Sequence, residues 1–158
     1  FRPSANEETL WELATYSNPQ QATRAVHALR KLLIYMNQQS EGLHVIEHLL
    51  LRARGNQPHQ GVAGDFYSLR ASVLLPAWSA RCSDPGFQMQ AAQLIAANTP
   101  AHIYPAIYWL SFSEMCQFEA DYKQWLDLLQ AEADSALLDE AALRLIGFLQ
   151  RLEQKCDG

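Results

Sequence analysis

The fold is decided by the stretch Tyr67-Ser68-Leu69-Arg70-Ala71-Ser72-Val73-Leu74-Leu75-Pro76 and by the two segments that follow it. In this stretch Leu69, Ala71, Val73 and Leu75 alternate with Arg70, Ser72 and Leu74, which predicts a strand over residues 67–76. Ser83-Asp84-Pro85 then offers a cap and a proline at the first helical position, so a helix is expected up to Pro100. We expect its apolar side chains to pack on the strands, and these are Phe87, Ala91, Leu94 and Ile95. Residues 101–110 form the next strand candidate, and a right-handed crossover would make the two strands parallel.

The rest of the sheet depends on residues 43–53. Pro105 interrupts the row of backbone donors in the segment 101–110, so that strand is expected at an edge. The short apolar run over 43–53 fits a buried strand or a helix. Residues 54–65 contain three glycines and one proline and form the clearest loop. Two strands alone are marginal, so we favour a third strand over 43–53 that pairs antiparallel with 67–76 through this loop.

Helices are expected before and after this region. The periodicity predicts helices over residues 5–16, 19–38 and about 135–155, and the capping box Ser111–Glu114 starts a further helix. That helix carries an apolar seam made of Met115, Phe118, Tyr122, Trp125 and Leu129. The predicted fold is a helix-rich α+β single domain with a small mixed sheet (strand–loop–strand–helix–strand) flanked by N- and C-terminal helices. Its parts are a helical lead-in over 1–40, an α+β core module over 42–130 and a C-terminal helix over 134–156.

Length and composition bound the function classes. The chain has 158 residues, a net charge of −5 and 49% apolar residues, which is typical of a globular domain with a sizeable core. No apolar stretch approaches the roughly 18 residues of a membrane span, and no signal peptide is visible. We therefore expect a cytoplasmic location, which also fits a subunit of an assembly that is built in the cell and later released. The start at Phe1 indicates an excised piece of a longer protein. Cys82, Cys116 and Cys156 are expected to be free thiols, with Cys116 in the core.

One short motif suggests catalysis. His44-Val45-Ile46-Glu47-His48 matches the H-x-x-E-H pattern. On a helix His44 and His48 share a face and can bind zinc, with Glu47 as general base and a third ligand from Glu114, Glu119 or Asp121. On a strand the two histidine Cα atoms would be about 13 Å apart, too far for one zinc ion.

We therefore expect no metal, cofactor or catalytic residue, and keep a zinc hydrolase or peptidase as the alternative. Instead, Glu47 and His48 are expected to form a buried pair that, with Arg52 or Arg70, ties the hairpin together. This interpretation predicts that His48→Ala or Glu47→Ala lowers the stability of the fold.

Binding surfaces are the other source of function. Trp78, Tyr104, Tyr108 and Trp109 lie at strand ends or faces and are candidate interface anchors, although core packing is the commoner role of such residues. A second alternative is a small-molecule or peptide-binding module built from the loop 54–65 and the aromatic residues of 101–110. The scattered arginines fit a solvated surface, so nucleic acid is not expected as a partner.

Several segments together carry a resemblance to a known module. These are Gly42 to Arg52 (a G-x-H-x-x-E-H-x-L-L-R segment), Asp65 to Trp78, Asp84 to Phe87, Thr99 to His102, Tyr108 to Leu110, and then Met115, Phe118-Glu119, Tyr122 and Trp125-Leu126. In this order they resemble a module of large bacterial proteins associated with contractile injection systems and phage-tail-like baseplates. The resemblance covers about residues 42–130. It implies a structural component without cofactor or catalytic residues, whose partners are other subunits or the remaining domains of the parent protein.

Overall fold

The computed structural model describes residues 14–39, 41–55 and 58–156 and divides the chain into two compact units, Phe1–Glu41 and Gly42–Gly158. The first unit contains helix α1, Pro19–Gln39, which confirms the predicted helix. Asn18 caps it, since its Oδ1 accepts a hydrogen bond from the Gln20 N–H at 2.9 Å. The helix predicted over 5–16 is wrong at residues 14–16, which are not helical; its other residues lie outside the described part.

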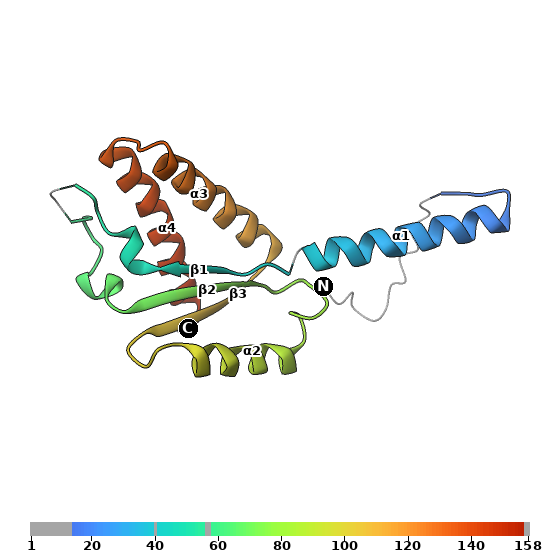
Figure 1. Ribbon diagram of the computed structural model, residues 1–158, viewed down its shortest axis with the longest axis horizontal. Helices are drawn as coiled ribbons and strands as arrows, with labels where there is room; N and C mark the ends of the chain where they lie inside the picture. The colour runs from blue at the N-terminus through green and yellow to red at the C-terminus, as the bar shows by residue number, and fades with distance from the viewer. Residues whose placement is uncertain (1–13, 40, 56–57, 157–158) are drawn as a thin grey trace. The chain divides into compact units, whose positions relative to one another are not determined.

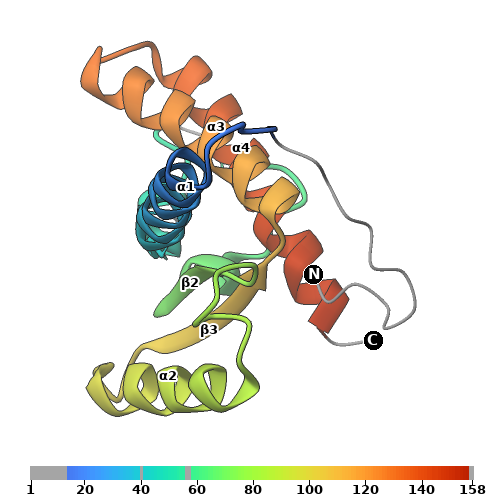
Figure 2. The same ribbon diagram turned by 90° about the vertical axis from the view of Figure 1, so that its right-hand side faces the viewer.

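The second unit is a three-stranded mixed sheet with helices on both faces (Figures 1 and 2). The strands are β1, His44–Glu47; β2, Arg70–Pro76; and β3, Tyr104–Leu110. Their order is β1-β2-β3, with β1 antiparallel and β3 parallel to β2, as predicted. Helices α3, Phe112–Gln130, and α4, Ser135–Cys156, cover one face, and α2, Pro85–Asn98, lies on the other. The predicted α+β class with a small mixed sheet is confirmed.

The segment 43–53 divides between the two conformations considered for it. Only His44–Glu47 is strand, and His48–Leu51 forms a 3-10 turn, η1. The strand β2 likewise starts later than predicted, because Gly64–Tyr67 forms a second 3-10 turn, η2, and Leu69 has a positive φ of 55°. All residues of β2 from Ala71 to Pro76 are buried, since β2 is the central strand with both faces covered.

Strand β3 is an edge strand, as Pro105 predicted. The Tyr104 N–H donates to the Leu69 carbonyl and the Ala77 N–H donates to the Leu110 carbonyl, so the even-numbered residues of β3 turn their backbone toward β2. Pro105 belongs to the alternate set, whose backbone faces the outer edge. Its missing N–H therefore removes no bond from the sheet.

The core lies between the sheet and helices α3 and α4. Helix α3 begins at the predicted capping box, and its seam residues Met115, Phe118 and Trp125 are buried, with Tyr122 and Leu129 packed beside them. Helix α4 adds a row of buried apolar side chains, which are Leu138, Ala141, Ala142, Leu145, Ile146, Phe148, Leu149 and Leu152. None of the described helices combines the length and apolar character that a membrane span requires.

Two packing predictions are wrong. Of the four α2 side chains expected to pack on the strands, Phe87, Ala91 and Ile95 are half-buried and Leu94 is 66% exposed. Helix α2 is apolar around most of its circumference, so its sequence did not single out the face that meets the sheet. Cys116, expected in the core, is exposed because it lies beside the buried seam rather than on it, whereas Cys82 is buried.

Candidate functional site

The two histidines of the H-x-x-E-H motif have different environments. His44 lies on β1, where its Nε2 is 3.1 Å from Glu119 Oε1 of α3 and its ring packs edge-on against Phe118 and Tyr122. Glu119 is mostly exposed, so the His44–Glu119 pair lies at the surface edge of the core. Neither contact directs the ring of His44 toward His48.

His48 begins η1 and is buried against the sheet. Its Nδ1–H donates to the Phe66 carbonyl at 2.8 Å, and its Nε2 accepts from the Ser72 hydroxyl at 2.8 Å. The ring also stacks on Phe66, with 4.3 Å between centroids. Burial lowers the pKa of His48, and the nearby Arg70 guanidinium lowers it further, although the bond to Phe66 raises it. Both ring nitrogens of this neutral histidine are therefore used in joining η1, η2 and β2.

The predicted buried Glu47–His48 pair is wrong for Glu47, which is exposed on β1. A strand places neighbouring side chains on opposite faces, so Glu47 turns away from the core that takes in His48. Arg70, one of the two expected partners, forms its ion pair with Glu153 of α4 instead. Arg52, the other, forms no ion pair with any residue in the described part of the chain.

The residues considered as zinc ligands are not brought together. Of the candidate third ligands, Glu119 meets His44 alone, Glu114 caps α3, and Asp121 lies 3.7 Å from Arg144. Within residues 14–39, 41–55 and 58–156, no group of three or more His, Cys, Asp or Glu side chains has a geometry that could hold a metal ion.

The four aromatic residues considered as interface anchors are also dispersed. Tyr108 is buried in the core, because β3 turns it toward α3 and α4, so it is not available as an anchor. Tyr104 is exposed, with the Arg70 guanidinium 5.9 Å from its ring centroid. Trp78 is half-buried and packs edge-on against Phe112, and Trp109 is half-buried on β3.

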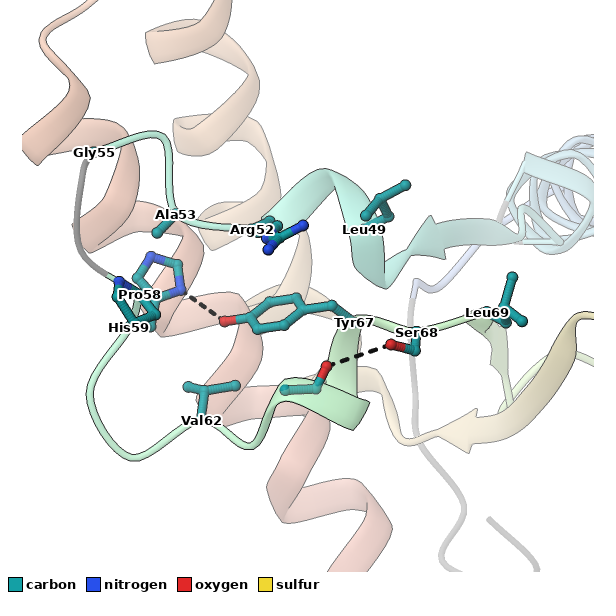
Figure 3. A pocket seen from close by; sticks show the side chains of 11 residues that line it. Leu49, Arg52, Ala53, Gly55, Pro58, His59, Val62, Tyr67, Ser68 and Leu69 are labelled. Carbon is teal, nitrogen blue, oxygen red and sulfur yellow. Dashed lines mark hydrogen bonds between the residues drawn. The ribbon is translucent and has the colours of Figure 1, made fainter.

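A groove of about 960 Å³ lies where η1, the glycine-rich loop and η2 meet (Figure 3). Leu49 and Arg52 line it from η1 and its end, Val62 from the loop, and Tyr67 and Leu69 from η2 and the approach to β2. The loop 54–65, expected to form a binding site, does contribute to this groove. The aromatic residues of 101–110 do not line it.

Buried polar contacts hold the loop side of the groove. His59, whose side chain is only 4% exposed, has its Nδ1 2.9 Å from the Tyr67 hydroxyl. Its Nε2 has no hydrogen-bond partner among the described residues but lies 3.8 Å from Asp139 Oδ1 of α4. Asp139 also accepts hydrogen bonds from the backbone N–H groups of Arg54 and Gly55, at 2.8 and 3.3 Å. The loop is thus tied to α4 at one carboxylate.

Five large apolar side chains on and near β1 and η1 lie in solvent, and two of them, Leu49 and Leu69, line the groove. Leu43, Val45, Leu49, Leu50 and Leu69 are each more than half exposed. We call these five residues the apolar rim. The rim was not predicted, because the run Leu49-Leu50-Leu51 fits a buried segment, whereas only Leu51 is buried. The glycine-rich loop 54–65 that follows was the signal in the sequence for a nearby binding surface.

Comparisons with known proteins did not identify a family for this chain. No family model matches the sequence, and no curated protein is detectably similar to it.

Proposed function

We propose that the unit Gly42–Gly158 is a non-catalytic structural and interaction domain of a larger bacterial assembly protein, of the phage-tail-like or contractile-injection type. The observation that carries the proposal is the apolar rim: Leu43, Val45, Leu49, Leu50 and Leu69 are 53 to 62% exposed. Isolated apolar residues are common on surfaces, but a group of large ones at one edge of a sheet is typical of a contact with another protein.

Two further observations support this function. The rim lies on and beside β1, an edge strand, and a partner can contact the backbone of such a strand as well as its side chains. The resemblance to the injection-system module begins at Gly42, where the second compact unit also begins. The resemblance supports the assembly context, and the rim supports the mode of action.

A crosslinking experiment in the producing cell tests the proposal. A photo-crosslinking amino acid is placed at Leu43 or Leu50 of the full-length parent protein, and at Leu137, an equally exposed leucine of α4, as the matched control. We expect the rim positions to crosslink to one discrete protein that sediments with the assembled particle, with much less product at the control. Equal or no crosslinking at all three positions would contradict the proposed function.

A further inference from the structure

The groove beside the rim combines two features that lower stability. Leu69 lines it with a backbone φ of 55°, in the left-handed region, where a residue with a Cβ is strained. Its side chain is also 62% exposed, so the residue gains little from burial. Strained backbone of this kind is concentrated at functional sites. A leucine kept in this position is suited to contacting an apolar partner.

Leu49 also lines the groove, from η1, and is 59% exposed, so two exposed leucines border it (Figure 3). Among the described residues that line the groove, Arg52 is the only one with a permanent charge. Burial raises the pKa of the Tyr67 phenol, and Arg52, which is exposed, lies close enough for its charge to lower that pKa in part. Asp139 of α4 is mostly buried and accepts the two loop N–H groups.

We propose that this groove binds an apolar segment of a partner protein, with an acidic side chain of that segment paired to Arg52. The proposal rests on the proposed interaction function and names the surface and the chemistry of the partner. The Arg52 guanidinium forms no ion pair with the described residues and shares the groove with Leu49 and Leu69, so it complements a carboxylate flanked by apolar side chains, because Arg and carboxylate form strong paired hydrogen bonds. A nucleic acid would need more cations than this groove supplies.

A display experiment tests the partner chemistry. A random-peptide library, joined to the coat protein through the peptide C-terminus so that no terminal carboxylate is free, is selected on the full chain and on Arg52→Glu. We expect peptides rich in apolar residues and containing Asp or Glu to be selected on the wild type, and Lys or Arg to replace the acid on Arg52→Glu. Arg30→Glu on α1 is the control and is expected to select the wild-type peptides. Peptides without an acidic excess, or no selection at all, would overturn the proposal.

A pair of matched variants separates binding from folding. Leu69→Asn removes the apolar side chain but suits a left-handed backbone, and Glu132→Asn makes the same replacement at the second non-glycine residue with positive φ, far along the chain. We expect neither variant to melt below the wild type. Leu69→Asn should bind the selected peptide at least about tenfold more weakly, and Glu132→Asn should bind it unchanged.

Equal binding by both variants would overturn the groove as the site. If no acidic peptide is selected but Leu43 and Leu50 still crosslink to a partner, the groove is not the binding site and the interaction function is retained. If those crosslinks are also absent, the proposed interaction function is wrong.

Discussion

The two faces of the sheet differ in how completely they are covered. The face toward α3 and α4 is closed by aromatic and aliphatic side chains, with Phe118, Leu145 and Ile146 almost fully buried. The opposite face carries α2, which buries no residue of its own, and Val45 of β1 on that face remains 54% exposed. The register places Val45 beside Val73, which is buried. On this face the side chains of the central strand are therefore covered, but those of the neighbouring edge strand β1 are not. The face toward α3 and α4 therefore holds the main core, and the other face leaves apolar surface at Val45 for contacts.

The largest expected effect tests the closed face. Phe118→Ala should lower the free energy of unfolding by about 3–5 kcal/mol, because the cavity lies at the centre of the core. Leu94→Ala on α2 should change it by less than about 0.5 kcal/mol, since that side chain is already in solvent. Urea denaturation of both variants measures the difference. Similar losses in the two variants would contradict the contrast between the faces.

The next effect concerns His48, which anchors η1 to the closed side. His48→Ala should cost about 2–3 kcal/mol, because it leaves the buried Ser72 hydroxyl and the Phe66 carbonyl without their partner. Glu47→Ala, one residue away but exposed, should cost nearly nothing.

This histidine also sets a pH dependence. Its pKa is lowered in the folded state, so below the ordinary value of about 6.5 the unfolded chain takes up a proton that the folded chain does not. Stability therefore falls as the pH is lowered from about 6.5. Denaturation curves at neutral and mildly acidic pH should show the gap between wild type and His48→Ala shrinking with acidification; a gap independent of pH would show that burial does not keep this ring neutral.

A smaller effect lies at the capping box of α3. Hydrogen bonds from the Ser111 side chain, then the Lys155 ammonium and the Ser111 backbone, lower the pKa of Glu114 to about 2. Its contribution is therefore present above the ordinary carboxyl pKa and is lost as the pH falls toward 2. Ser111→Ala should cost about 1 kcal/mol at neutral pH and less in acid, measured by thermal melting. Glu114 lies at the surface and is only partly buried, so a loss well above this would show that the box does more than cap the helix.

The smallest expected effect is a gain in stability rather than a loss, and it concerns Leu69 in the groove. Leu69→Asn should raise the free energy of unfolding by up to about 1 kcal/mol, because it relieves a strained backbone without opening a cavity. Denaturant midpoints check this value. A clear loss of stability would mean that the Leu69 side chain contributes to folding despite its exposure, and would weaken the contrast on which the groove rests.

Much of the fold followed from local sequence. The cap and proline at Asp84-Pro85, the capping box at Ser111 and the apolar seam of α3 act within a few residues of themselves, and each was predicted correctly. Pro105 identified the edge strand for the same reason. The prediction failed where a residue's surroundings come from distant segments, as for Leu94, Cys116 and Tyr108. The loop 54–65 was proposed as a binding segment, but Leu49 and Leu69, which line the groove with it, were not.

The sequence by itself determined the order and type of the main elements and the parallel pairing of β2 with β3, because periodicity, caps and crossover handedness are local properties of the chain. Only the tertiary structure decided which apolar residues are covered. The same H-x-x-E-H stretch buries His48, exposes Glu47 and turns His44 to Glu119, because α3, η2 and β2 reach it from elsewhere in the sequence. The groove arises in the same way, since Leu49, Arg52 and Leu69 come from segments on either side of a loop that Asp139 of α4 holds.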